Sequence, residues 1–136
     1  MARRTEAYVD TAAFIAFLDR SDTHHARFTR LFSDPPPLVT SALVVAEGHG
    51  WFLRRYDTHR AIEFLNFLAL LSVLSIVPVD DRALAEAGRV VKKYSDQPLT
   101  LADAHGLVIM RKRRVARCWS TDRHLTLEGA SLVVHE

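Results

Sequence analysis

After its first six residues the chain runs Ala7-Tyr8-Val9-Asp10-Thr11, a short apolar segment that ends on an acidic residue. The apolar residues predict a buried strand, and from Thr11 to Asp19 apolar side chains recur at helical spacing. An ionised carboxylate among apolar groups is costly unless it is paired, hydrogen-bonded or bound to a metal ion. Asp10 therefore marks the end of the first predicted strand and is the first candidate functional residue.

The same alternation of β-like runs and helical patterns continues along the whole chain. It predicts an α/β fold with a mainly parallel central sheet. Further strands are expected at residues 38–40, 74–79, 115–119 and 131–134. Further helices are expected from a cap at Asp22 or Thr23 to Phe32, from Ser41 to about Arg55, from Thr58 through Ile62, Leu65, Leu68 and Ala69, from Asp80 to Tyr94, and from Thr100 onward, with about one turn at 123–127.

The composition is that of one folded domain. The chain has 136 residues, of which 49% are hydrophobic and 25% are charged. These values are typical of a soluble globular protein and argue against a disordered or fibrous chain. We therefore expect residues 1–136 to form a single domain.

Other sequence features predict a cytoplasmic protein that does not enter a membrane. The single Cys118 cannot form an internal disulfide, and its apolar neighbours predict a buried thiol in a reducing compartment. Asp10 interrupts the N-terminal apolar run before a secretory segment develops. The longest apolar stretch, residues 64–79, contains polar residues and falls short of the roughly 20 residues that a membrane span needs.

Three further carboxylates lie in apolar surroundings, namely Glu47, Asp103 and Asp122. No Lys or Arg stands within three positions of Asp10, Glu47 or Asp103. Asp10 and Asp122 follow predicted strands, and ligands of open α/β sheets bind beyond the carboxyl ends of the strands. Glu47 has apolar neighbours or glycine three and four positions away, so it faces the apolar side of its helix. If the four side chains converge, a divalent cation is the natural group to neutralise them.

Carboxylate oxygens are hard ligands that suit Mg²⁺ or Mn²⁺. A cation of this kind can polarise a phosphoryl oxygen and activate a water molecule for attack. The predicted chemistry is therefore the hydrolysis of a phosphodiester bond.

Each acid except Glu47 also has an ordinary structural explanation. Asp10 can cap the helix that follows it, and Asp122 can belong to a turn. Asp103 and Thr100 have the spacing of a capping box. A carboxylate in the middle of a helix has no capping role, so Glu47 is the hardest to explain by structure alone.

Other polar residues carry weaker signals. The seven histidines show no zinc-binding spacing with the lone cysteine and are assigned to the surface or the core. Asp96 is either an exposed loop residue or an accessory acid. The basic clusters at residues 111–114 and around Arg54, Arg55 and Arg60 either contact a polyanion or lie on solvated faces.

Four segments resemble, in the same order, the acidic motifs of PIN-domain nucleases, and most closely those of VapC-type toxins from VapBC toxin-antitoxin systems. These segments are Val9-Asp10-Thr11, Thr40-Ser41 with Glu47, Leu99-Thr100-Leu101-Ala102-Asp103-Ala104, and Trp119-Ser120-Thr121-Asp122-Arg123-His124-Leu125. The resemblance spans nearly the whole chain. It implies a PIN-like α/β/α sandwich and Mg²⁺-dependent endoribonuclease activity, with Mn²⁺ as a second candidate ion.

The resemblance also implies roles for single residues. Asp10, Glu47, Asp103 and Asp122 would bind the metal ion and carry catalysis. The hydroxyl groups of three neighbours would orient water or phosphate, namely Thr11, Ser120 and Thr121. The expected partners are RNA as substrate, a cognate antitoxin protein and a second copy of the chain in a homodimer.

Other functions remain open at this point. The chain could be a housekeeping PIN-domain nuclease that processes RNA without an antitoxin, or a non-catalytic PIN-fold binding module. A haloacid-dehalogenase-type phosphatase fits worse because it would need a second aspartate at the position of Ala12. Apolar residues of the third and fourth helices either receive a partner helix or belong to the core, namely Phe52, Phe64, Phe67, Leu68 and Leu71.

Overall fold

The computed structural model describes residues 4–136 and centres on a parallel β-sheet. Its strands lie in the order β3-β2-β1-β4-β5, and every neighbouring pair is parallel. The strands are β1 (Ala7–Val9), β2 (Leu38–Ser41), β3 (Leu74–Val77), β4 (Arg117–Trp119) and β5 (Ser131–Leu132). The predicted parallel sheet is confirmed.

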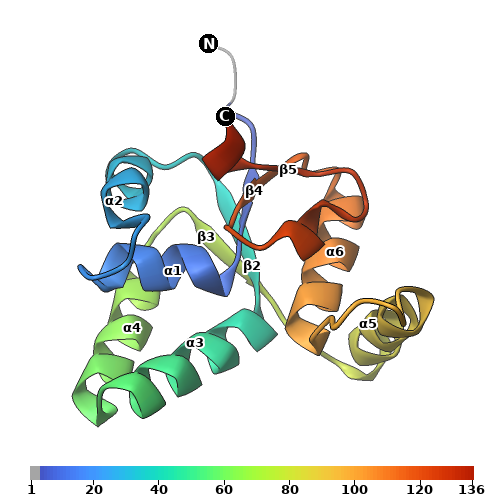
Figure 1. The fold of residues 1–136 in the computed structure, drawn as a ribbon, viewed down its shortest axis with the longest axis horizontal. Helices are drawn as coiled ribbons and strands as arrows, with labels where there is room; N and C mark the ends of the chain where they lie inside the picture. The colour runs from blue at the N-terminus through green and yellow to red at the C-terminus, as the bar shows by residue number, and fades with distance from the viewer. Residues whose placement is uncertain (1–3) are drawn as a thin grey trace.

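Helices cover both faces of this sheet, as Figure 1 shows. They are α1 (Thr11–Leu18), α2 (His25–Ser33), α3 (Ala42–Arg55), α4 (Thr58–Leu70), α5 (Asp81–Lys93) and α6 (Leu101–Arg113), with two short 3₁₀ helices, η1 (Arg123–Thr126) and η2 (Val133–His135). Helices α1 to α4 lie on one side, and α5 and α6 lie on the other. The predicted α/β/α sandwich is confirmed.

The alternation of side chains along β1 divides the core in two. Ala7 and Val9 pack with α1 to α4, whereas Tyr8 packs with α5 and α6. All three are fully buried, as expected for a strand covered on both faces. Helix α6 comes close to the sheet because position 106 is glycine, where an added Cβ would lie 2.7 Å from Tyr8 Oη.

The predicted helix starts differ from the observed ones at α2 and α4. Helix α4 is capped by Asp57, whose side chain accepts a hydrogen bond from the Arg60 N–H, so Thr58 is its first residue. Helix α2 begins at His25, and Asp22 instead accepts a hydrogen bond from the His24 N–H in the turn before it. In both places an aspartate side chain accepts a backbone N–H in the turn where the helix starts, as is typical of aspartate near a helix N-terminus.

Only some of the apolar residues named for the fourth predicted helix are buried in α4. Ile62 and Leu65 are 48% and 40% exposed, and the buried residues are Ala61, Phe64 and Leu68. The helix is turned toward α3 because Phe64 packs onto Gly48, where the missing side chain leaves room for the ring. Phe52 and Phe64 are fully buried and Leu68 is nearly so, which assigns these three residues to the core of the chain itself.

The last two strands are shorter than predicted. Residue Arg114 ends α6 in the left-handed conformation, and the Val115 N–H bonds to the Met110 carbonyl, so β4 begins only at Arg117. Strand β5 ends at Leu132, and η2 begins at the next residue, Val133. Between residues 4 and 136 no helix is both long enough and apolar enough to cross a membrane.

Candidate functional site

Asp10 lies at the carboxyl end of β1 and is almost fully buried. It precedes α1, but its side chain makes no capping hydrogen bond to that helix. Instead, Oδ2 of Asp10 accepts a hydrogen bond of 2.9 Å from the Ser120 hydroxyl, beyond the end of the neighbouring strand β4. The capping explanation for Asp10 is therefore not the one the structure adopts.

Ser120 also organises the next acid. Its hydroxyl oxygen accepts a hydrogen bond of 2.9 Å from the Asp122 N–H. Asp122 in turn caps η1, because its Oδ1 accepts a hydrogen bond of 2.9 Å from the His124 N–H. Asp122 thus has the turn role that its sequence allows, and this role is filled by one of its two carboxylate oxygens.

Asp103 lies in the first turn of α6 and forms a complete capping box. The Thr100 N–H donates to Asp103 Oδ2, and the Asp103 N–H donates to Thr100 Oγ1. The donor–acceptor distance is 3.1 Å in each hydrogen bond. Asp103 is nevertheless buried, and one of its oxygens lies within 4.8 Å of ligand atoms of Asp122 and His124. The capping box fixes this carboxylate in a position where it faces other polar groups.

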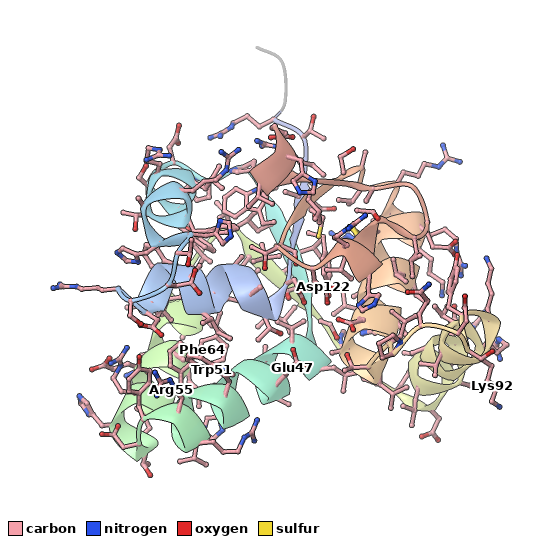
Figure 2. The ribbon with its side chains drawn as sticks, viewed as in Figure 1. Glu47, Trp51, Arg55, Phe64, Lys92 and Asp122 are labelled. Atoms are coloured by element: carbon pink, nitrogen blue, oxygen red, sulfur yellow. The ribbon has the colours of Figure 1, made fainter. Side chains whose placement is uncertain are left out.

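Glu47 comes from the middle of α3 and is half-buried. Its negative charge acts on both Asp10 and Asp103 and raises the pKa of each. In Figure 2, Glu47 and Asp122 are drawn toward the middle of the molecule, whereas Arg55 and Lys92 lie at its rim. The four predicted acids come from two strand ends and two helices, and they lie close enough for their charges to interact.

The pKa values show what this grouping does to the carboxylates. The pKa of Asp10 is raised to about 7, mainly by burial; the charges of Asp103 and Glu47 add to the rise, and the Ser120 hydrogen bond opposes it. Burial also raises the pKa of Asp103, to which the charges of Asp122 and Glu47 add. Carboxylates that repel one another in a buried place are stabilised by a nearby positive charge.

The described part of the chain supplies no Lys or Arg that would stabilise the four carboxylates by its positive charge. The ion pairs of residues 4–136 leave the four acids without a basic nitrogen within 4.0 Å, except for His124 Nδ1, which lies 3.0 Å from Asp122 Oδ1. Next to Asp10, the buried Thr11 hydroxyl has no hydrogen-bond partner among the described residues. Hard oxygen donors and an unsatisfied hydroxyl fit a divalent cation and its water molecules.

The other residues singled out by the sequence differ in their surroundings. Thr121 is half-buried, and its side chain forms no hydrogen bond with another described residue. Asp96 is exposed between α5 and α6 and is not part of the group of Asp103, Asp122 and His124. His105 is a core residue, because it is almost fully buried, and its Nδ1 shares a hydrogen bond of 2.6 Å with the Ser41 hydroxyl.

His124 was missed by the sequence interpretation. The assignment of all histidines to the surface or the core does not describe it, because its ring reaches the carboxylates of Asp103 and Asp122. The sequence signals for this contact were the spacing Asp122-x-His124 and its place in the segment from Trp119 to Leu125 that resembles a PIN-domain motif. That spacing gains meaning only once η1 turns both side chains to the same side.

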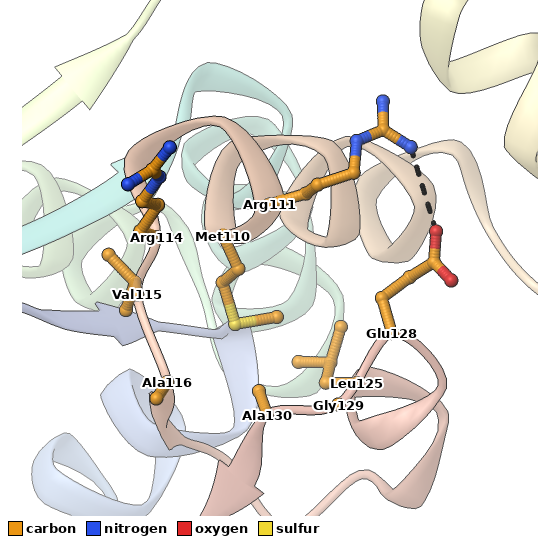
Figure 3. A pocket seen from close by; sticks show the side chains of 9 residues that line it. All are labelled: Met110, Arg111, Arg114, Val115, Ala116, Leu125, Glu128, Gly129 and Ala130. Atoms are coloured by element: carbon orange, nitrogen blue, oxygen red, sulfur yellow. Dashed lines mark ion pairs between the residues drawn. The ribbon is translucent and has the colours of Figure 1, made fainter.

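A cavity of about 330 Å³ lies elsewhere, at the opposite end of α6 from Asp103. Figure 3 shows its lining, with the ion pair of 3.6 Å between Arg111 and Glu128. The neighbouring basic side chains are also paired, Lys112 with Glu86 and Arg113 with Glu6. Three of the four basic residues at positions 111–114, which the sequence suggested as a contact for a polyanion, are therefore paired with acidic side chains.

The chain is similar to known proteins of one family. The family model described as "PIN domain" matches residues 7–126. The chain is 28% identical over 116 residues to Ribonuclease VapC26 of Mycobacterium tuberculosis, covering 85% of each chain. It is 24% identical over 123 residues to the 23S rRNA-specific endonuclease VapC20 of the same species, covering 90% of this chain and 93% of the relative.

Solved structures show the same fold. The crystal structure of Mycobacterium tuberculosis VapC20, described as a Sarcin-Ricin loop cleaving toxin, superposes with a TM-score of 0.83 at 21% identity, covering 92% of this chain and 96% of that one. A toxin-antitoxin complex from Klebsiella pneumoniae gives a TM-score of 0.61 at 18% identity, covering 93% and 95% of the two chains. The α/β/α fold of this chain is thus shared with these proteins.

Proposed function

The chain belongs to the PIN domain family, and from this premise we propose that it is a metal-dependent endoribonuclease that acts as the toxin of a toxin-antitoxin pair. One observation carries the proposal. Among four carboxylates from separate elements of the fold, the charges of Asp103 and Glu47 raise the pKa of Asp10, and those of Asp122 and Glu47 raise the pKa of Asp103, with no Lys or Arg within 4.0 Å of the four acids among residues 4–136. RNA as the substrate is supported by the similarity to Ribonuclease VapC26 and the 23S rRNA-specific endonuclease VapC20.

In this proposal Asp10, Glu47, Asp103 and Asp122 hold Mg²⁺, with Mn²⁺ as the second candidate. When bound, the cation supplies Lewis-acid polarisation of the phosphoryl oxygen and neutralises the charge that develops during hydrolysis. The fit rests on the donor set, because buried carboxylate oxygens are the groups that bind such cations. The unpartnered hydroxyl of Thr11 is a further oxygen that a bound water molecule or a phosphate would satisfy.

The chain's own hydrogen bonds pre-organise the carboxylates. Ser120 holds the Asp10 side chain and the backbone of Asp122 at once. The capping box with Thr100 holds Asp103. Side chains fixed in this way need little reorganisation when substrate arrives, which is where much of an enzyme's rate enhancement originates. Thr121 is positioned in the same loop and is proposed, with Thr11 and Ser120, to orient water or phosphate.

The proposal also covers the partner protein, the domain organisation, the oligomeric state and the cellular compartment. A protein antitoxin as partner is supported by the similarity to the Klebsiella pneumoniae toxin-antitoxin complex. We also propose that residues 1–136 form one PIN domain, that the chain forms a homodimer, and that it acts in the cytoplasm, where the free, buried Cys118 thiol stays reduced.

RNA cleavage by the purified chain tests the proposal. We expect cleavage with Mg²⁺, and a loss of about a hundredfold or more with EDTA, with Asp10→Asn and with Asp103→Asn. Asp96→Asn is the matched control, because it removes an exposed carboxylate and should leave the rate unchanged. Equal cleavage in all of these reactions would reject metal-assisted hydrolysis by these residues.

Growth measurements separate a toxin from a housekeeping nuclease. Expression of the active chain should arrest growth, and co-expression of the protein encoded beside it should relieve the arrest. Normal growth during expression of a cleavage-competent chain would favour an RNA-processing role instead.

A further inference from the structure

Among residues 4–136, the imidazole of His124 is the one basic side-chain group with a nitrogen within 4.0 Å of a carboxylate of the acidic site. One of its ring nitrogens and one oxygen each of Asp103 and Asp122 lie within 4.8 Å of one another. Two ligands on opposite sides of a Mg²⁺-sized ion are about 4 Å apart, since each lies about 2.1 Å from it. These three side chains therefore need only a small adjustment to contact one ion.

The contact with Asp122 also orients the ring. His124 Nδ1 lies 3.0 Å from Asp122 Oδ1, the oxygen that accepts the His124 N–H as well. Adjacent ligands of an octahedral ion of this size are themselves about 3 Å apart. The local turn that caps η1 thus holds the imidazole and the carboxylate at a separation that suits two neighbouring ligands.

The surroundings give the ring no other evident partner. Among the described residues, the His124 ring pairs with Asp122 and forms no hydrogen bond with any other group. The His124 side chain is partly exposed, so an ion can reach it from solvent. Thr11, next to Asp10, adds a buried hydroxyl without a partner, which is an independent sign that the site lacks a group.

We propose that His124 donates an imidazole nitrogen to the cation held by Asp103 and Asp122, and that the site therefore prefers a first-row transition-metal ion such as Mn²⁺ to Mg²⁺. The inference rests on the proposed function, because it assumes that the acids bind a cation. Its chemical reason is that imidazole is a poorer ligand for Mg²⁺ than for transition-metal ions, whereas carboxylates accept both. A mixed nitrogen and oxygen set therefore shifts the preference.

Electron paramagnetic resonance of Mn²⁺ bound to the full chain tests the inference without relying on activity. The loss of the free-ion signal gives the dissociation constant, and the spin-echo modulation detects a coordinated ¹⁴N nucleus. We expect ¹⁴N modulation in the wild type and a change in its pattern when histidine alone is labelled with ¹⁵N. This measurement on the wild type needs no variant that could misfold.

Variants then assign the nitrogen. His124→Gln and His124→Asn should abolish the modulation and weaken Mn²⁺ binding by about tenfold or more, with a smaller loss for Mg²⁺ measured by competition. His59→Gln, on the exposed surface of α4, is the matched control and should change neither affinity nor modulation.

Two different failures can be told apart. Mn²⁺ that binds without ¹⁴N modulation, or affinities for Mn²⁺ and Mg²⁺ that fall equally in His124→Gln, would overturn the role of His124 and leave the carboxylate site intact. Mn²⁺ binding that is absent, or that is unchanged in Asp103→Asn, would overturn the proposed function together with this inference.

Discussion

The hydroxyl of Ser120 donates a hydrogen bond of 2.9 Å to Oδ2 of Asp10 and so joins the ends of two neighbouring strands. Strands β1 and β4 are parallel and pair through Val9 and Trp119, which brings the next residue of each strand to the same edge of the sheet. The same hydroxyl accepts the N–H of Asp122. One small side chain therefore fixes two of the four acids.

Ser120→Ala should destabilise the protein by about 1 to 3 kcal/mol in EDTA, because it leaves a buried carboxylate and a backbone N–H without their partner. It should also weaken Mg²⁺ binding, since Asp10 and Asp122 lose their common support. Urea denaturation and calorimetric titration measure the two effects. Thr121→Ala is the matched control for stability, because the Thr121 side chain forms no hydrogen bond with another described residue, and an equal loss of stability in the two variants would contradict the role of Ser120.

The stability of the metal-free protein should depend on the ionisation of Asp10. Its pKa is raised from 3.8 to about 7 in the folded state, so the folded chain binds the proton more tightly than the unfolded chain does. The resulting stabilisation is complete below about pH 4 and is lost as the pH rises toward 7, at most about 4 kcal/mol in total.

Urea denaturation in EDTA between pH 4 and 8 checks this, with Asp10→Asn as the reference. The wild type should lose stability relative to this variant as the pH rises, and saturating Mg²⁺ should reduce the loss because the cation binds the ionised carboxylate. If the free energy of unfolding changed with pH in parallel for the two proteins, ionisation of Asp10 would not destabilise the folded chain, and this prediction would be wrong.

Two glycines in helices should respond to alanine in opposite directions. At Gly48 an added Cβ would lie 2.5 Å from the ring of the buried Phe64, so Gly48→Ala should destabilise the protein by about 1 to 3 kcal/mol. At Gly88 nothing lies within 4 Å, so Gly88→Ala should stabilise it by up to about 1 kcal/mol through helix propensity. Thermal denaturation of both variants is the measurement, and a stabilising Gly48→Ala would refute the packing of α4 on α3.

Much of the fold follows from local patterns in the sequence. Parallel strands share a carboxyl edge, so residues that follow them, such as Asp10 and Asp122, could be expected to meet. The apolar neighbours of Glu47 along its helix indicated that it turns inward. The structure brings these acids together with Asp103, while their catalytic roles stay predictions.

What the sequence did not predict depends on contacts between distant segments. Ile62 and Leu65 are as apolar as the buried residues of α4, and only the space above Gly48 decides which face is covered. His124 contacts Asp103 across the fold, so its place in the site cannot be deduced from its own neighbours in the sequence. Asp103 forms a capping box and faces the other acids as well, whereas the sequence presented these two roles as alternatives.

The central claim is that the four carboxylates form a cation site, and the change in melting temperature on adding Mg²⁺ at constant ionic strength tests it most directly. At a Mg²⁺ concentration of about 100 times the dissociation constant, the wild type and Asp96→Asn should each gain about 2.7 kcal/mol, or roughly 10 °C. Asp103→Asn keeps an oxygen for the capping box but loses the charge, so it should melt at or above the wild-type temperature in EDTA and gain little from Mg²⁺. An equal gain in Asp103→Asn and the wild type would contradict the claim.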